Sequence, residues 1–105
     1  MRILCVCHAG TVRSGAMAFY LKHCGHDALA LSSKYNSEET KHLLYEWAEK
    51  ILVMDYTLIF TIPQEYQLKV INTNVGNDVW QNPLHPDLLE TCGKIYYQIR
   101  ERLSV

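Results

Sequence analysis

Short uninterrupted apolar runs alternate along the chain with longer stretches in which apolar residues recur at helical spacing. Residues 2–6 and 50–54 are the clearest runs, and their length and apolar character are typical of strands buried on both faces. Residues 27–31 and 68–71 show the same pattern less cleanly. We therefore predict four strands, of which the first and third are buried.

Three stretches between and after these runs predict helices. Residues 13–24 place Ala16, Phe19 and Tyr20 on one face, with His23 or Cys24 extending it, and Gly25 follows as a natural helix stop. A second helix begins at a capping pair, either Asn36 with Glu39 or Ser37 with Thr40. Its predicted buried residues are Leu43, Leu44 and Trp47.

The second half of the chain predicts one short and one long helix. Residues 56–66 favour a short helix that Pro63 interrupts, and Pro86 opens the last helix at its first turn after a loop over residues 72–85. The buried face of the last helix consists of Leu88, Leu89, Cys92, Ile95, Tyr96, Ile99 and Leu103.

This order of strands and helices predicts a single α/β domain over residues 1–105. Helical crossovers between successive strands imply a four-stranded parallel sheet with helices on both faces. Ligands of such sheets bind beyond the carboxyl ends of the strands. Four segments meet at that edge: residues 7–13, residues 32–36, the segment from Asp55 onward and residues 72–85.

The segment from Cys7 to Ser14 carries the clearest candidate chemistry, because it joins the first strand to the first helix. Amides in such a loop and in the first helical turn form an anion site, and they stabilise a thiolate placed at its mouth. Arg13 adds a planar guanidinium that matches two oxygens of a phosphate. This pattern predicts phosphoryl transfer through a phosphocysteine on Cys7. The predicted phosphate-binding residues are His8, Ala9, Gly10, Thr11, Val12, Arg13 and Ser14.

The sequence Cys7-His8-Ala9-Gly10-Thr11-Val12-Arg13-Ser14 resembles the phosphate-binding loop of the low-molecular-weight protein tyrosine phosphatases. That family also places the loop directly after its first strand. The resemblance implies that Cys7 is the nucleophile, that Arg13 holds the phosphoryl group and that Ser14 hydrogen-bonds the thiolate.

Four positions depart from the family pattern. Ala9-Gly10 stands where the family has Gly-Asn, so the asparagine that braces the loop is absent. Val12 replaces a second cysteine, which rules out a disulfide within the loop, and Gly15 replaces a proline.

Cleavage of an aryl phosphate also needs a proton donor for the leaving oxygen. Asp78-Val79-Trp80 resembles the family's general-acid loop, so the resemblance implies Asp78 as the catalytic acid. Asp87 is the alternative, although a carboxylate at a helix start is also stabilised by the helix dipole. Met54-Asp55 matches a pair common in the family, and a turn-forming aspartate accounts for it equally.

Two aromatic residues are candidates for the walls of a phosphotyrosine pocket. Trp80 and Tyr35 lie in loops that are predicted to flank Cys7. Ordinary packing or exposure on the surface accounts for either one as well.

Composition narrows the classes of partner. A net charge of −1 gives no electrostatic case for nucleic acid or an anionic membrane, and no apolar run reaches transmembrane length. The chain begins without a signal-peptide pattern, so we expect a cytoplasmic monomer whose four cysteines are reduced. The spacing of the cysteines and histidines does not match the common zinc motifs, and neither a metal nor a cofactor is expected.

The expected function is therefore a protein tyrosine phosphatase that acts on a phosphotyrosine-containing protein or peptide. Three alternatives remain open. A phosphocarrier similar to the IIB components of sugar phosphotransferase systems would use Cys7 and Gly10 but would need neither Arg13 nor an acid. An arsenate reductase would need further cysteines to take over an oxidised sulfur. A phosphotyrosine-binding module with impaired catalysis is compatible with the altered loop.

Overall fold

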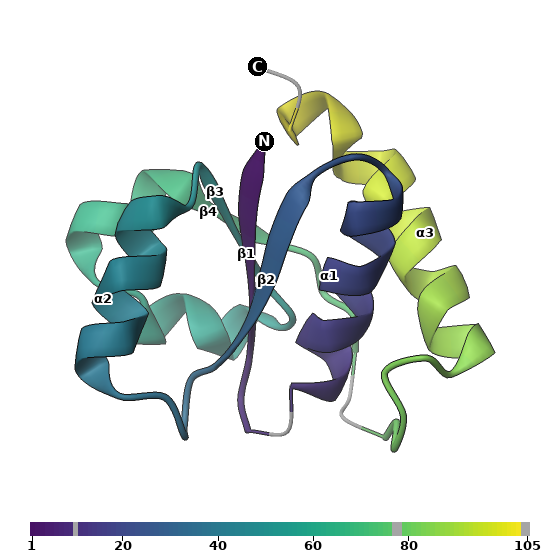
Figure 1. Cartoon of the computed structure of the whole chain (residues 1–105), viewed down its shortest axis with the longest axis horizontal. Helices are drawn as coiled ribbons and strands as arrows, with labels where there is room; N and C mark the ends of the chain where they lie inside the picture. The colour runs from purple at the N-terminus through teal and green to yellow at the C-terminus, as the bar shows by residue number, and fades with distance from the viewer. Residues whose placement is uncertain (10, 77–78, 104–105) are drawn as a thin grey trace.

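The predicted four-stranded parallel sheet is present. The structure, a computed structural model, describes residues 1–9, 11–76 and 79–103. The strands are β1 (Arg2–Cys7), β2 (Asp27–Ser32), β3 (Lys50–Val53) and β4 (Val70–Asn72), and all three neighbouring pairs are parallel. Their spatial order is β2-β1-β3-β4, so the strand that leads into the Cys7 loop lies inside the sheet (Figure 1).

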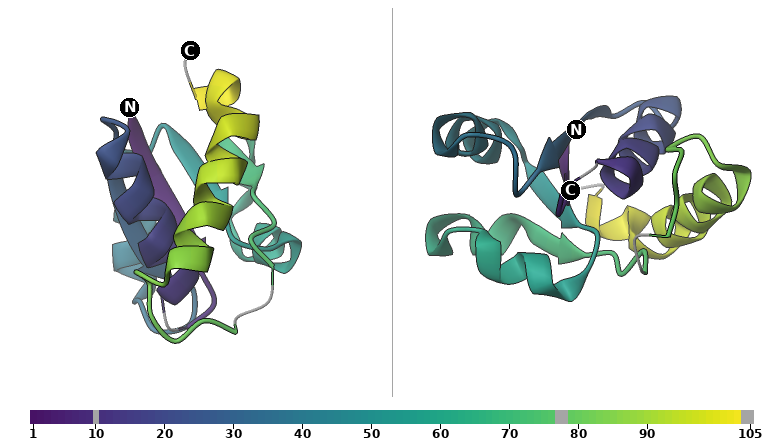
Figure 2. Two further views of the ribbon diagram at one scale, coloured as in Figure 1. Left: turned by 90° about the vertical axis from the view of Figure 1, so that its right-hand side faces the viewer. Right: turned by 90° about the horizontal axis from the view of Figure 1, so that it is seen from below.

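Helices cover both faces of the sheet, as predicted (Figure 2). Helices α1 (Val12–His23) and α3 (Pro86–Leu103) pack against each other on one face. Helix α2 (Glu38–Trp47) and the two 3-10 helices η1 (Tyr56–Thr61) and η2 (Gln64–Lys69) lie on the other side. Residues Ile3 to Cys7 of β1 are buried between these layers. No helix of the described residues is long and apolar enough to span a bilayer.

The buried face of α1 differs from the predicted one. Ala16 is buried as expected, but Phe19 is 41% exposed, and Met17 and Leu21 fill the core instead. The reason is that α1 lies between the sheet and α3, so it buries two sides rather than one stripe. Gly25 ends the helix region with φ 92°, in agreement with its predicted role as a stop.

Helix α2 has one of the two predicted N-caps, but the residue that it buries most deeply was not among those predicted. The Ser37 hydroxyl accepts a hydrogen bond from the Thr40 N–H (3.1 Å), which confirms the second capping pair. Leu43 is 72% exposed, whereas Tyr45 is buried against the ring of Tyr66 from η2, with 5.3 Å between ring centroids. An aromatic pair across the layer thus determines which side of α2 faces inward.

The segment before β4 is helical for longer than predicted. Pro63 separates η1 from η2 as expected, but η2 continues through Lys69, and β4 starts only at Val70. Leu68 is 99% exposed and does not belong to a strand. The predicted start of α3 at Pro86 is confirmed, as is its buried face.

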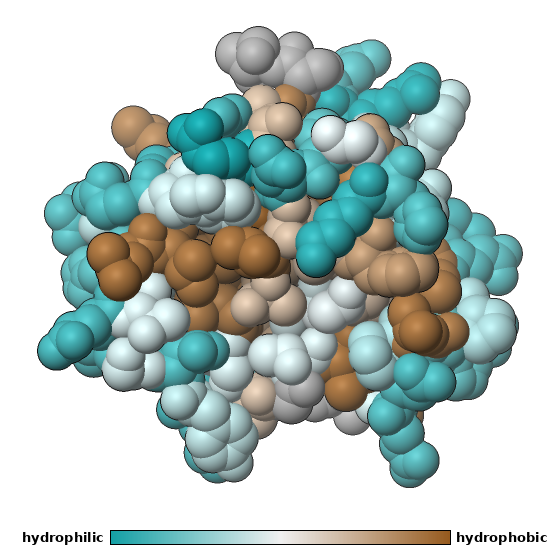
Figure 3. Space-filling view, viewed as in Figure 1, coloured by the Kyte–Doolittle hydropathy of each residue, from teal (hydrophilic) through white to brown (hydrophobic). Residues whose placement is uncertain are grey.

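One face of the molecule carries exposed apolar side chains in two places. Figure 3 shows them gathered over α2 and again beside α1. The exposed apolar residues of these helices include Leu43 and Phe19. The cavity described below lies elsewhere, at the carboxyl edge of the sheet.

Candidate active site

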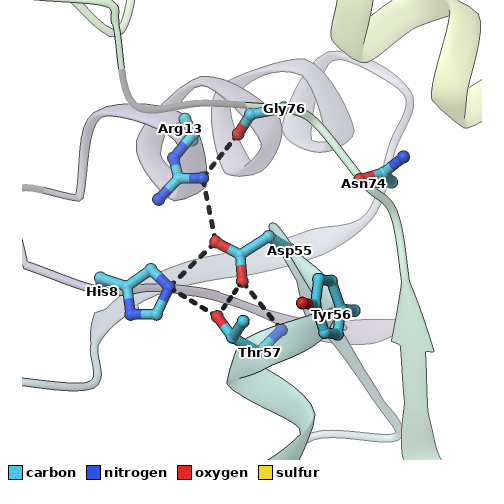
Figure 4. Close-up of a pocket in the computed structure, with 7 residues that line it drawn as sticks. All are labelled: His8, Arg13, Asp55, Tyr56, Thr57, Asn74 and Gly76. Atoms are coloured by element: carbon cyan, nitrogen blue, oxygen red, sulfur yellow. Dashed lines mark hydrogen bonds and ion pairs between the residues drawn. The ribbon is translucent and has the colours of Figure 1, made fainter.

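A cavity of about 350 Å³ opens at the carboxyl edge of the sheet, where the ligand-site rule for parallel sheets places it. Segments that follow β1, β3 and β4 form its walls together with the first turn of α1 (Figure 4). The lining residues are His8, Arg13, Asp55, Tyr56, Thr57, Asn74 and Gly76.

The Cys7 thiol lies at the start of the loop and is almost fully buried, with 1% of the residue exposed. The backbone N–H of Ser14, in the first turn of α1, donates a hydrogen bond to Cys7 Sγ at 3.3 Å. This contact places the sulfur at the N-terminal end of α1, next to the backbone N–H groups of its first turn. Cys7 itself is not among the residues that line the cavity, and its role as the nucleophile stays a prediction.

Thr11 forms the tight turn that leads the loop into α1. Its backbone is left-handed (φ 54°), which is uncommon for a β-branched residue, and its carbonyl accepts the Gly15 N–H at 2.7 Å. A left-handed residue next to a helical turn directs successive N–H groups toward one point, and such a concave row of amides binds anions. Strain at this position is consistent with a functional loop.

Arg13 joins three segments of the chain. Its side chain is 2% exposed, and Nη1 donates to the Gly76 carbonyl at 2.7 Å and to Asp55 Oδ2 at 3.3 Å. The guanidinium is thus fixed on the cavity wall by a residue after β3 and a residue after β4. An arginine held in this way is already oriented for an oxyanion, so ligand binding does not have to order it.

Asp55 is both a turn former and a member of the site. Its Oδ1 accepts the Thr57 N–H (3.0 Å) and the Thr57 hydroxyl, which caps η1, while Oδ2 lies 2.9 Å from His8 Nε2. Burial raises the pKa of Asp55, but the hydrogen bond from Thr57, the charge of His8 and the bonds from Arg13 and His8 together lower it. Asp55 is therefore an ionised acceptor at neutral pH.

The loop after β2 braces the Cys7 loop. The Ser33 N–H donates to the Cys7 carbonyl (2.8 Å), and the Lys34 N–H donates to the His8 carbonyl (2.8 Å). The Ser32 hydroxyl also donates to the His8 carbonyl, at 3.3 Å, and Asn36 Oδ1 accepts the Ser32 N–H at 2.8 Å. These contacts hold the backbone at a point where the family's bracing asparagine is absent.

Several predicted residues lie away from the described cavity. Trp80 is half-buried against the core, with its ring 4.9 Å from that of His85. Tyr35 is 71% exposed, with Lys34 Nζ over its ring. Asp87 is exposed in the first turn of α3. Among the described residues, these three do not line the cavity, and their assignments stay predictions.

The remaining members of the predicted set divide into two groups. Ala9 and Val12 are half-buried in the loop and its helical junction. Gly10 and Asp78 lie outside the described residues, so their predicted roles also stay predictions. Tyr56, Thr57, Asn74 and Gly76 were not predicted individually, but they lie in the two segments, from Asp55 onward and 72–85, that the sequence placed at this edge.

The other three cysteines do not share the surroundings of Cys7. Burial, followed by the proximity of Cys92 and Cys7, raises the pKa of Cys5, and burial raises the pKa of Cys92 to about 12. Cys24 is exposed. In the described part of the chain, no three His, Cys, Asp or Glu side chains come together as metal ligands would.

No family model matches the sequence, and no curated protein sequence matches it. Solved structures do match the fold. The YwlE arginine phosphatase from Geobacillus stearothermophilus aligns with a TM-score of 0.65 and 19% identity, over 97% of this chain and 92% of that chain.

Two further YwlE structures align with TM-scores of 0.58. One is a cysteine-to-serine mutant whose active site serine is phosphorylated, at 14% identity over 97% of this chain and 93% of that one. The other is a Bacillus subtilis mutant, at 16% identity over 100% of this chain and 99% of that one. The chain therefore has the fold of these YwlE structures. Cys7 is the last residue of β1, so it stands at the carboxyl end of the first strand, as the resemblance implied.

Proposed function

We propose that this chain is a cysteine-dependent phosphatase of the low-molecular-weight family and that it acts on phosphorylated protein side chains through a phosphocysteine on Cys7. The observation that carries the proposal is the hydrogen bond from the Ser14 N–H to Cys7 Sγ, one residue after Arg13, whose guanidinium Gly76 and Asp55 hold on the cavity wall. A nucleophile and an oxyanion-binding cation in one rigid loop suit phosphoryl transfer.

In the proposed first step, Cys7 Sγ attacks phosphorus while the bond from phosphorus to the leaving atom breaks. Arg13 and the loop amides hold the equatorial oxygens, whose charge is spread widely in the transition state. The leaving atom takes a proton from Asp78. In the second step, water attacks phosphorus, the S–P bond breaks, Asp78 takes the proton of the water, and inorganic phosphate leaves.

The contacts of Asp55 argue against this residue as the catalytic acid. This carboxylate lines the cavity, but its lowered pKa and its bonds to Arg13 and His8 make it a poor proton donor. We therefore retain Asp78 as the proposed acid, on the strength of the sequence Asp78-Val79-Trp80, and Asp87 as the alternative.

Phosphotyrosine is the proposed substrate, with Tyr56 as the aromatic side chain on the described cavity wall. Phosphoarginine is the second candidate, because the matched YwlE structures are described as arginine phosphatases. The cavity also suits a guanidinium leaving group, since Asp55 and Asn74 offer oxygen acceptors there.

The buried contacts of Arg13 favour a hydrolase over a phosphocarrier, which has no need of a fixed guanidinium. Burial of Cys5 and Cys92 gives no support to a thiol relay of the arsenate reductase kind. A phosphotyrosine-binding module would bind the same ligand, so only a measurement of turnover distinguishes it from a phosphatase.

The test is hydrolysis of matched phosphotyrosine and phosphoarginine peptides in EDTA by the wild type, Cys7→Ser and Cys24→Ser. We expect the wild type and Cys24→Ser to release phosphate and Cys7→Ser to be inactive, because Cys24 is an exposed cysteine at the far end of α1. The faster peptide identifies the substrate class. If Cys7→Ser keeps wild-type turnover, the phosphocysteine mechanism is wrong.

A second experiment, which adds a phosphorylated carrier protein and measures peptide binding, separates the alternatives. A wild type that is inactive on both peptides, yet holds phosphate on Cys7 after mixing with a phosphorylated carrier protein, would be a phosphocarrier. A wild type that binds the peptides tightly without turnover would be a binding module.

A further inference from the structure

One member of the cavity wall opposes the proposed ligand. Asp55 carries a negative charge on the wall that a phosphate dianion must approach, and its side chain is 22% exposed. Like charges in a partly buried site repel strongly, because the local dielectric is lower than that of water. The site therefore needs a device that neutralises Asp55 without removing it from Arg13.

The contacts of Asp55 provide that device. Oδ1 is covered by the N–H and hydroxyl of Thr57, and Oδ2 faces both Arg13 Nη1 at 3.3 Å and His8 Nε2 at 2.9 Å. His8 Nε2 also lies 3.0 Å from Thr57 Oγ1. In Figure 4 the imidazole and the guanidinium approach the carboxylate from two sides. The tautomer with hydrogen on Nε2 is the one this carboxylate selects.

We infer that His8 is a positioning residue that screens Asp55 from the incoming phosphate and leaves the guanidinium of Arg13 available to it. This inference rests on the proposed function, because it assumes a phosphate in this cavity. Without the imidazole, Arg13 would be the one side-chain donor described on Oδ2, and Asp55 would compete with phosphate for the same guanidinium.

Screening differs from direct attraction of the anion by His8. The Nε2–H is already donated to Asp55 and Thr57, so this nitrogen is not free to bind phosphate. Screening predicts that His8 matters only while Asp55 is charged. Direct attraction predicts that His8 matters equally whether or not position 55 carries a charge.

A double-mutant cycle on inorganic phosphate binding, measured by isothermal titration calorimetry, separates the two. We expect His8→Ala to weaken binding about tenfold in the wild type and less than about twofold in Asp55→Asn, a coupling of at least about 1 kcal/mol. His8→Asn, which keeps a neutral N–H donor, should recover part of the loss. Asp55→Ser is the second background, because serine can still cap η1 without a charge.

Equal loss in the charged and neutral backgrounds would overturn the screening role while leaving the phosphate site intact. No loss on His8→Ala in the wild type would overturn it as well. If the folded wild type binds no phosphate at all, the inference and the proposed function fail together, and this outcome differs from the first two.

Discussion

Replacement of Arg13 by lysine tests the central cation of the site without removing its charge. Arg13 Nη1 makes two hydrogen bonds at 2.7 and 3.3 Å while the side chain is 2% exposed. A lysine is shorter and presents one nitrogen, so it cannot hold both partners and two phosphate oxygens together. One charged hydrogen bond is worth about 1.5–3 kcal/mol, so Arg13→Lys should lower the unfolding free energy by about 2 kcal/mol.

The loss of activity should be larger than that loss of stability can explain. Removing one preorganised oxyanion donor lowers kcat about 100- to 1000-fold. A domain with a stability of about 5–15 kcal/mol remains folded after losing about 2 kcal/mol, so unfolding would hide little of this effect. We therefore expect kcat for Arg13→Lys to fall at least about a hundredfold while the far-ultraviolet spectrum is unchanged.

The assay combines kcat at saturating p-nitrophenyl phosphate with urea denaturation of the same preparations. Arg100→Lys is the matched control, because Arg100 is exposed on α3, over the ring of Tyr97, and should leave kcat unchanged. Loss of an oxyanion donor is expected to lower kcat about a hundredfold. If kcat for Arg13→Lys stays within about threefold of the wild type, the role of the arginine fork is refuted.

Three further predictions follow from the site and the core. Asp78→Asn should lower kcat about 100-fold or more on phosphotyrosine peptide, as expected for a general acid, whereas Asp87→Asn should keep it within about twofold; the reverse order would move the acid to Asp87. The folded pKa of Asp55 is lowered, so its contribution to stability is present above its unfolded pKa and is lost as the pH falls through the folded value. The stability difference between wild type and Asp55→Asn, measured by urea titration, should therefore shrink at acid pH. Leu88→Ala, at a fully buried position, should cost about 2–5 kcal/mol in the same titration, and Leu43→Ala, at an exposed one, less than about 0.5 kcal/mol.

The strands and the Cys7 loop were predictable because their signals are local. An apolar run predicts a buried strand such as β1. A loop between a strand and a helix can bind an anion with its own backbone N–H groups. The side of α2 that faces inward was not predictable in this way. Tyr45 is buried because Tyr66 lies opposite it, and periodicity within one helix does not contain that partner.

The contacts of Asp55 and Gly76 with Arg13 were not predictable for the same reason, although the segments that carry them were placed at this edge of the sheet. Arg13 is separated by 42 residues from Asp55 and by 63 from Gly76, and the sheet order brings the three together. The Met54-Asp55 pair marked the position without revealing its partners. Gly76 contributes only a backbone carbonyl, so its side chain gave no signal.

The altered loop sequence bears on the choice between a catalyst and a binding module. The family's bracing asparagine acts through its side chain, but here the Cys7 and His8 carbonyls are held by the N–H groups of Ser33 and Lys34. Backbone donors survive changes of side chain, and Asn36 fixes the turn that presents them. A loop held from outside can keep its amides directed at the anion without an internal brace, and that preorganisation is what phosphoryl transfer requires. The substitutions at Ala9 and Gly10 therefore do not by themselves argue for lost catalysis. Asn36→Ala should reveal the difference: it should lower kcat more than it weakens phosphate binding if the brace serves the transition state, and it should weaken phosphate binding with kcat unchanged if the brace serves binding alone.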